Sequence, residues 1–231
     1  YIMEDVQPYF HFGISIDCVI FGFDQGELKI LLIKRREAPF DNTWALPGNL
    51  VSPKEELEQA AIRILKEITG LEYLFLDQVK TFGEVDRHPL GRVITTAYCA
   101  LININNFSLV PGSLAERADW VSVTHVKKLA FDHNNIFNAC FNHLRNSIRT
   151  RPIGFELLPQ KFTLSELQDL YESILQQKLD KRNFRKKILA MNILIDNREQ
   201  QKHVAHRPAR LYEFDENKYN TFLKEGFTFD L

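Results

Sequence analysis

The segment Trp44–Leu71, WALPGNLVSPKEELEQAAIRILKEITGL, constrains the fold of this chain more than any other segment. A tight turn at Pro47-Gly48-Asn49 precedes a predicted helix over residues 53–69, with a proline in its first turn and Gly70 directly after its end. Apolar residues recur along this helix at intervals of three and four: Leu57, Ala61, Ile64, Leu65 and Ile68. An amphipathic helix of this kind packs its apolar face on a core.

The same segment resembles the signature of the Nudix hydrolase family, which reads Gly, five residues, Glu, seven residues, then Arg-Glu-(apolar)-x-Glu-Glu-x-Gly-(apolar). The matched positions are Glu55, Arg63, Leu65, Glu67, Gly70 and Leu71. Asn49 stands at the signature glycine, whereas Ile64 and Ile68 replace two of the glutamates. The alternative is an ordinary amphipathic helix that fits the signature by chance.

The two isoleucines change the chemistry that the resemblance implies. Carboxylates spaced three and four positions apart on one helix face hold Mg²⁺ against a diphosphate, and Glu67 alone remains here. Because Mg²⁺ needs several oxygen ligands, we expect no metal site, no catalytic residue and no cofactor. The resemblance gives scaffolding roles to Glu55 and Arg63, as an ion pair between loop and helix, and to Gly70, as a left-handed C-cap.

The composition is ordinary for a soluble globular protein, with 231 residues, 45% of them hydrophobic and 26% charged. The chain has no apolar run of about 18 residues, and its first residues, YIMEDVQPYFHF, lack a basic region followed by an apolar one. We therefore expect a cytoplasmic protein that makes no membrane contact. Cys18, Cys99 and Cys140 are far apart in apolar segments and are expected to be buried thiols.

Strand patterns surround the predicted helix. Alternating or continuous apolar runs predict five strands, over residues 12–23, 27–34, 74–82, 92–104 and 118–123. Asp24-Gln25-Gly26 joins the first two as a hairpin. A further helix is expected over residues 134–148, with Asp132 as its N-cap, and His133 is either a local structural histidine or a ligand. Strands wrapped by helices indicate an α/β/α sandwich.

In Nudix-like folds a ligand cleft lies beside the helix of the signature, here called the box helix because the signature segment is the Nudix box. The loop over residues 83–91 is expected to overhang this cleft. Five side chains are candidate effector contacts: Arg36, Trp44, Glu67, Asp86 and Arg87. They combine an aromatic plate with polar side chains, a combination that suits a sugar site. Alternatively, Arg36 belongs to a solvated strand end, and Asp86 and Arg87 belong to a plain charged turn.

The composition changes at residues 146–155, NSIRTRPIGF, where we place a domain boundary. The first predicted domain comprises residues 1–150 and the second comprises residues 151–231. In the second domain, the capping box Thr163-x-x-Glu166 begins a helix that has one apolar face.

A second helix, over residues 181–191, follows closely and has Asp180 as its expected N-cap. Short strands are predicted over residues 193–195 and 211–214, with a polar loop between them. Two helices joined by a short turn and followed by a hairpin are typical of a winged helix-turn-helix domain.

Basic residues are concentrated in this second domain. Residues 178–210 contain ten lysines and arginines but three acidic residues, a net charge of +7 in a chain whose total is −1. Eight residues on the second helix and the hairpin loop are candidate DNA contacts: Lys181, Arg182, Asn183, Arg185, Lys186, Lys187, Lys202 and Arg207. We expect Arg182, Asn183 and Lys186 to meet base edges of duplex DNA. Phosphate contacts are expected mainly from Arg185, Lys187, Lys202 and Arg207, unless the basic face is simply solvated.

A Nudix domain without its acids, followed by a basic winged helix, resembles the Nudix-related transcriptional regulators of bacteria, which include arabinose-responsive members. The runs that carry the resemblance are Leu129–His133, Pro152–Pro159, Phe162–Gln168 and Asp180–Lys187. The resemblance implies an α/β fold in which a Nudix-type α/β/α sandwich precedes the winged helix-turn-helix domain.

The same resemblance implies a homodimer on a palindromic DNA operator, and a Nudix domain that senses a small effector instead of cleaving it. The implied effector is a sugar or a nucleotide-derived metabolite such as ADP-ribose, and its effect on DNA binding could have either sign. Two other hypotheses stay open. One is a Mg²⁺-dependent Nudix hydrolase of nucleoside diphosphate derivatives, with metal held by acids outside the box. The other is a module that recruits a protein.

Overall fold

The computed structural model describes residues 11–71, 76–202 and 207–226. The chain packs into two compact units, and each is described by itself below. Unit 1 comprises residues 1–22 and 29–142, and unit 2 comprises residues 23–28 and 143–231. Because this division falls inside one continuous helix, the domain boundary after residue 150 stays a prediction.

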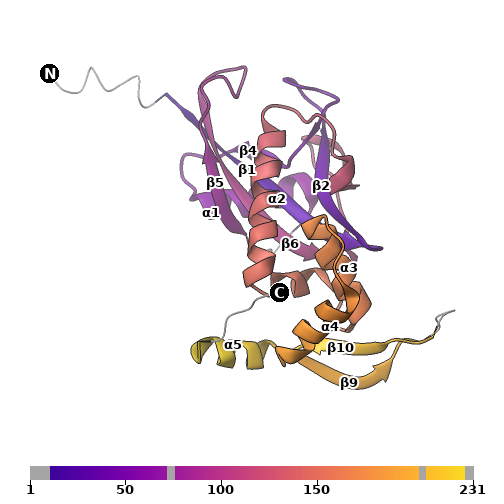
Figure 1. Cartoon of the computed structure of the whole chain (residues 1–231). Helices are drawn as coiled ribbons and strands as arrows, with labels where there is room; N and C mark the ends of the chain where they lie inside the picture. The colour runs from indigo at the N-terminus through magenta and orange to yellow at the C-terminus, as the bar shows by residue number, and fades with distance from the viewer. Residues whose placement is uncertain (1–10, 72–75, 203–206, 227–231) are drawn as a thin grey trace. The chain divides into compact units, whose positions relative to one another are not determined.

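A seven-stranded sheet is the frame of unit 1 (Figure 1). Its strands are β1 (Gly13–Asp24), β2 (Glu27–Arg35), β3 (Trp44–Ala45), β4 (Gly48–Leu50), β5 (Asp77–Phe82), β6 (Val93–Asn103) and β7 (Ala115–Ser122). The order β3-β2-β1-β6-β5 runs across the sheet, with β4 paired to β1 and β7 paired to β2. The five predicted strands are thus present, although Leu74, in the third of them, lies outside the described residues. Gln25 and Gly26 have positive φ angles of 50° and 81°, which suits the predicted hairpin turn.

Helices cover both faces of this sheet. Side chains of β1 alternate between the faces, so that Ile16 joins a core with helix α1 (Leu57–Thr69). Phe21 points the other way, to Phe137 of helix α2 (His133–Thr150), with ring centroids 6.4 Å apart. The predicted α/β/α sandwich is confirmed. Two short 3-10 turns, η2 (Ile104–Asn106) and η3 (Val123–His125), flank β7.

Helix α1 begins later than the sequence pattern predicts, at Leu57 instead of Pro53. The reason is that Glu56 is the N-cap and forms a capping box with Gln59, so the residues before it belong to the loop. The end of the helix is as predicted, because Gly70 closes it with a left-handed φ of 76°.

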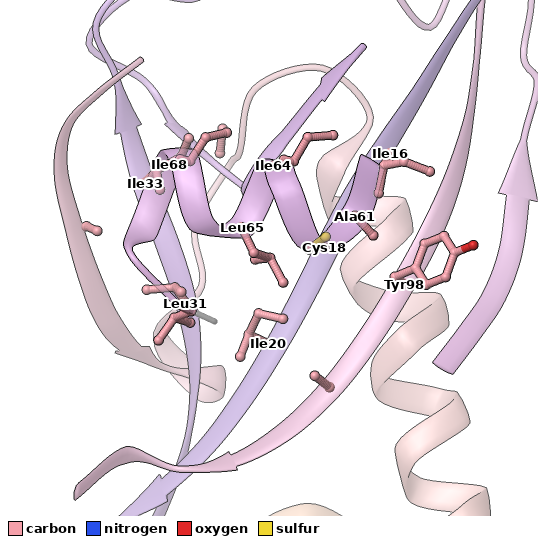
Figure 2. Close-up of a cluster of buried hydrophobic side chains, with 14 of the residues drawn as sticks. Ile16, Cys18, Ile20, Leu31, Ile33, Ala61, Ile64, Leu65, Ile68 and Tyr98 are labelled. Atoms are coloured by element: carbon pink, nitrogen blue, oxygen red, sulfur yellow. The ribbon is translucent and has the colours of Figure 1, made fainter. Parts of the chain in front are cut away.

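The apolar face of α1 fills one core of unit 1. Ile64, Leu65 and Ile68 are each at most 1% exposed. Figure 2 shows them among the strand residues Ile16, Ile20, Leu31 and Ile33. Full burial of such a side chain contributes about 1.5–3 kcal/mol to folding. The two isoleucines that replace signature glutamates are therefore core residues in this fold.

Unit 2 is a winged helix. Its elements are the 3-10 turn η4 (Ile153–Leu157), β8 (Phe162–Thr163), α3 (Leu164–Leu175), α4 (Lys181–Ala190), β9 (Leu194–Gln200), β10 (Arg210–Phe214) and α5 (Glu216–Lys224). The strands form an antiparallel sheet in the order β8-β10-β9. The predicted pair of helices and the following hairpin are confirmed, whereas α5 has no counterpart among the elements predicted from sequence.

Both predicted helix caps of unit 2 are present. The Thr163 hydroxyl accepts a hydrogen bond from the Glu166 N–H at 3.1 Å, while the Glu166 carboxylate accepts one from the Thr163 N–H at 2.7 Å. The Asp180 carboxylate accepts a hydrogen bond from the Asn183 N–H at 2.8 Å. Phe184 of α4 packs against α3 and is 4% exposed. No helix of the described segments is long and apolar enough to cross a bilayer.

Candidate effector pocket and DNA-binding surface

The box of unit 1 keeps the ion pair that its signature residues predict. Arg63 donates two hydrogen bonds to the Glu55 carboxylate, at 2.8 Å from Nε and 2.5 Å from Nη2, and one from Nη1 to Glu67 at 2.9 Å. The hydrogen bonds from Arg63 lower the pKa of Glu55 to about 2. Because Arg63 also donates to the Leu50 carbonyl at 3.1 Å, it ties the loop before α1 to the helix.

These residues do not fit a Mg²⁺ site. The Glu67 carboxylate is paired with Arg63. The other two positions at which the Nudix signature has a metal-binding glutamate are occupied by the buried Ile64 and Ile68. Mg²⁺ demands oxygen ligands in near-octahedral geometry. Among residues 11–71, 76–202 and 207–226, no group of three or more His, Cys, Asp or Glu is arranged to hold a metal ion. The Nudix signature residues that remain, Glu55 and Arg63, brace the loop against α1.

A separate cavity of about 280 Å³ lies in unit 1, beside the turn that precedes β4. Residues from β1, the end of β2, the loop after β5 and the start of α2 line it. Its charged and aromatic lining consists of Asp17, Arg35, Arg87, His88, Phe131 and His133. The cavity therefore combines guanidinium groups, a carboxylate and flat rings, which are the groups expected in a ligand site.

A buried ionic cluster forms one wall of this cavity. Arg87, whose side chain is 3% exposed, donates two hydrogen bonds to the Asp132 carboxylate, at 2.9 and 2.7 Å, and one to Asp17 at 3.4 Å. Thr95 donates to the same Asp17 oxygen at 2.8 Å. Burial alone would raise the pKa of Asp17, but His133, Thr95 and Arg87 together lower it below its ordinary value. Asp17 is therefore a buried carboxylate.

His133 positions the turn before β4 against this cluster. Its Nδ1 accepts a hydrogen bond from the Leu46 N–H at 2.9 Å, so Nε2 carries the proton that faces Asp17 Oδ1 at 3.3 Å. A side chain at Gly48 is excluded, because a Cβ there would lie 2.1 Å from Asp17 Oδ1. Of the two roles considered for His133, the structural one is observed. Both carboxylate oxygens of Asp132, the expected N-cap, accept hydrogen bonds from Arg87.

Arg87 presents part of its guanidinium to the cavity. Nε and Nη2 are used by the two aspartates, while Nη1 has no hydrogen-bond partner in the described part of the chain. Since Arg87 lines the cavity, an anionic group there can accept from Nη1. Asp17 and Asp132 thus fix the Arg87 guanidinium through Nε and Nη2.

Aromatic rings form another part of the cavity lining. The Phe131 ring stacks on His88, with centroids 5.1 Å apart, and meets the edge of Phe40 at 4.7 Å. The Arg35 guanidinium lies 5.0 Å from the centre of the Phe131 ring. Phe40 and Phe131 both have positive φ angles, 63° and 50°, which bulky residues rarely adopt outside functional sites. The surrounding structure therefore holds these rings in an unusual conformation.

The five effector contacts predicted from sequence do not meet in one pocket. Arg87 lines the cavity just described. Trp44 lines another cavity, of about 530 Å³, where its ring lies 5.5 Å from the Arg117 guanidinium carbon. The strand pattern explains the separation, because Trp44 pairs with Lys34 in the sheet and not with the loop that carries Arg87.

The other three predicted contacts also lie outside the cavity lining. Arg36 donates from Nη2 to the Ala115 carbonyl at 3.2 Å, Glu67 is paired with Arg63, and Asp86 is exposed. As effector contacts, all five residues stay predictions. Sequence reasoning passed over Asp17 and Phe131, although an aspartate inside the apolar strand sequence ISIDCVIF is a usable signal.

The basic residues of α4 form a solvent-facing surface in unit 2. The exposed residues of α4 are Lys181, Arg182, Asn183, Lys186 and Lys187. The hairpin β9–β10 with its loop is the wing of the domain, and Lys202 and Arg207 on it are exposed as well. The opposite face of α4 is buried through Phe184 and Ile188. The helix therefore has the amphipathic form of a recognition helix. His203 and His206, in the wing loop between Lys202 and Arg207, lie outside the described residues.

Arg185 differs from the other predicted DNA contacts. Its Nη2 donates to the Ser165 hydroxyl of α3 at 3.0 Å, and its Nε is buried without a partner in the described structure. The side chain therefore bridges the two helices of the helix-turn-helix. Arg185 has a structural role in addition to its predicted phosphate contact.

Comparisons with known proteins agree with this two-part architecture. The model of the NUDIX domain matches residues 11–140, and the model of the NrtR DNA-binding winged helix domain matches residues 154–214. An ADPR responsive transcriptional repressor of Acinetobacter baylyi is 36% identical over 211 residues, which cover 90% of this chain and 84% of the relative. The chain belongs to the NrtR-type Nudix regulators.

Two solved structures resemble this NrtR-type regulator. Shewanella oneidensis NrtR complexed with a 27mer DNA is 28% identical, with a TM-score of 0.72, and the match covers 87% of this chain and 93% of that one. The NUDIX domain of the same protein, complexed with ADP ribose, is 29% identical with a TM-score of 0.54, over 57% of this chain and 87% of that one. This chain is thus a transcriptional regulator with a Nudix effector domain and a DNA-binding winged helix.

Proposed function

We propose that this NrtR-type regulator is a repressor whose operator binding is weakened by ADP-ribose. The observation that carries the proposal is that the Nudix domain keeps a ligand cavity without two of the glutamates of its signature. Its box positions Ile64 and Ile68 have become core, while a charged and aromatic cavity remains beside the box. The ADPR responsive relative, similar over 90% of this chain, supports the choice of ligand.

The cavity has the groups that such a ligand requires. The proposed donors for a diphosphate are the Nη1 group of Arg87 and the guanidinium of Arg35. The rings of Phe131 and His88 offer a face on which a base stacks. The two guanidiniums favour a phosphorylated effector over a neutral sugar. ADP-ribose is larger than the cavity, so we expect part of it to extend to the open side.

We further propose that the regulator binds a palindromic operator as a homodimer. A single winged helix reads one half-site, and two-fold symmetric operators are matched by two-fold symmetric proteins. The exposed Arg182, Asn183 and Lys186 on α4 are the proposed base contacts. The wing residues Lys202 and Arg207 are proposed phosphate contacts.

ADP-ribose is expected to release DNA from the wild-type protein. The measurement is fluorescence anisotropy of the tightest-binding duplex selected from genomic fragments, with and without saturating ADP-ribose. An allosteric coupling of about 5–150-fold in affinity is typical. Neighbouring arginines provide a matched pair. Arg35→Gln, in the cavity lining, should abolish the response. Arg36→Gln tests the effector contact predicted from sequence, and a retained response is expected because Arg36 is bonded to Ala115 outside this lining.

The outcomes separate the parts of the proposal. Absence of duplex binding even at low salt would exclude a DNA-binding regulator and favour the recruiting module. Binding that ADP-ribose leaves unchanged would exclude this effector but keep the regulator. A response lost in Arg36→Gln and kept in Arg35→Gln would place the effector outside the cavity.

No Mg²⁺-dependent hydrolysis of ADP-ribose, NADH or nucleoside triphosphates above background is expected. The reason is that Glu67 is the one carboxylate left on the signature helix face, and it is paired with Arg63. Hydrolysis is measured by chromatography of the released products, with and without Mg²⁺. Turnover that Glu67→Gln abolishes would contradict the proposal and favour the hydrolase hypothesis.

A further inference from the structure

Unit 2 contains a cavity of about 650 Å³ that the DNA-binding surface does not use. It lies between α5 on one side and η4, β8 and β10 on the other. Helix α5, over residues 216–224, follows the matched winged helix domain, which ends at residue 214. A helix beyond the domain match therefore completes this cavity.

The face of α5 that lines the cavity is only partly packed. Glu216, Tyr219, Asn220 and Leu223 line it, and their spacing of three, four and seven places them on one helix face. Such a face is normally buried. Here Tyr219 is buried, whereas Leu223 remains 45% exposed. The space between this face and the rest of unit 2 is large enough for a small molecule.

The floor of the cavity is aromatic. The rings of Phe155 and Phe214 are stacked, with centroids 4.3 Å apart, and Phe162 lies 5.5 Å from Phe155. Tyr219 of α5 lies 5.7 Å from Phe214. Rings of this kind provide a flat apolar surface for a ligand that itself contains rings.

The charged residues of the lining are mainly acidic. Glu156, Glu213 and Glu216 line the cavity, against one basic residue, Arg151. Glu213 is fixed, because Oε1 accepts a hydrogen bond from Asn197 at 3.1 Å. This acidic lining contrasts with the basic face of α4 in the same unit, and it disfavours phosphates. A cation is favoured both by the carboxylates and by aromatic side chains.

We propose that the cavity under α5 is a second ligand site, specific for an organic cation with an aromatic body. The rings of the ligand would lie against Phe214, which is more exposed than Phe155 and Phe162 beneath it, and its positive charge would face Glu213 and Glu216. The site is separate from the effector cavity of unit 1, and it takes a ligand of opposite charge.

The test uses the full chain and two probes of equal shape and opposite charge. N-methylacridinium and 9-anthroate each have three fused rings, the first with a positive and the second with a negative charge. Isothermal titration calorimetry is expected to show binding of N-methylacridinium and not of 9-anthroate. Glu213→Gln with Glu216→Gln should weaken cation binding by about threefold to tenfold. Glu225→Gln, which removes one carboxylate charge just outside the lining, should leave cation binding unchanged.

A filling variant gives an independent readout. Asn220→Trp places a large side chain on the lining face of α5 and should abolish cation binding, with circular dichroism to confirm that the variant is folded. If that variant does not fold, the glutamine variants still decide the question. No binding of N-methylacridinium at millimolar concentration would overturn the proposal. Equal binding of 9-anthroate, or cation binding that the double glutamine variant retains in full, would overturn it as well.

Discussion

Replacing Arg87 with alanine is expected to lower the free energy of unfolding by about 3–5 kcal/mol, the usual cost of removing one partner from a buried ion pair. The substitution leaves Asp17 and Asp132 facing each other without the guanidinium that links them at 3.4 and 2.7 Å. Both carboxylates are at most 12% exposed, so water compensates poorly for the loss.

Urea denaturation followed by circular dichroism measures this change. Arg92→Ala is the matched control, because Arg92 lies on the same loop and donates to the exposed Gly83 carbonyl at 2.7 Å. The control should change stability by less than about 1 kcal/mol. Equal effects of the two substitutions would show that the cluster does not stabilise the fold.

The same cluster predicts a dependence of wild-type stability on pH. The pKa of Asp17 is lowered in the folded state, so its contribution is fully present above its unfolded pKa of about 3.9 and is lost as the pH falls through the lower folded value. Only the loss of this contribution is confined to acid, and the contribution is complete at neutral pH. Arg87→Ala should reduce this pH-dependent contribution, because the Arg87 guanidinium is one of the groups that lower the pKa of Asp17.

Arg182→Ala is expected to cost about 1–3 kcal/mol in binding to the cognate operator and to relax its sequence preference. Arg182 is exposed in the first turn of α4, and an arginine there can make two hydrogen bonds to one guanine. Fluorescence anisotropy on cognate and scrambled duplexes measures both effects. An unchanged ratio between the two duplexes would remove Arg182 from the base contacts.

Lys202→Ala is the matched comparison, because Lys202 is a proposed phosphate contact on the wing. It should weaken cognate and scrambled duplexes alike and reduce the salt dependence by about one counterion. The two variants together therefore separate readout of sequence from general attraction to DNA. If both behaved alike, the division of roles between α4 and the wing would be wrong.

Much of the fold follows from local sequence patterns. Five strands of unit 1, α1, α3, α4 and the hairpin β9–β10 were predictable because each has a regular apolar spacing or a recognisable cap or turn, such as Thr163 or Asp180. The short β3 and β4 were not predicted, because two or three residues show no periodicity. The start of α1 was not, because Pro53 is acceptable in a first turn and nothing local shows that Glu56 would be the cap. Helix α5 was missed because its nine residues include just three apolar ones, Tyr219, Phe222 and Leu223, within little more than one turn.

The effector cavity was less predictable, since its residues come together through pairing over long distances. Arg87 bonds to partners 70 and 45 positions away in the chain, and no spacing rule connects them. Phe131 was named in the sequence only as part of a family resemblance. Its role as a cavity wall depends on a backbone conformation with φ of 50°, which bulky residues seldom adopt.

The burial of Ile64 and Ile68 has an evolutionary consequence. Both side chains are at most 1% exposed, so a mutation back to glutamate at either position would place a carboxylate in a dry interior, at a cost of several kcal/mol. Proteins of ordinary stability have about 5–15 kcal/mol to lose. Two such substitutions would consume most of this margin before a complete metal site existed. A Mg²⁺ site at these two positions is therefore not reachable from this sequence through stable single-substitution intermediates.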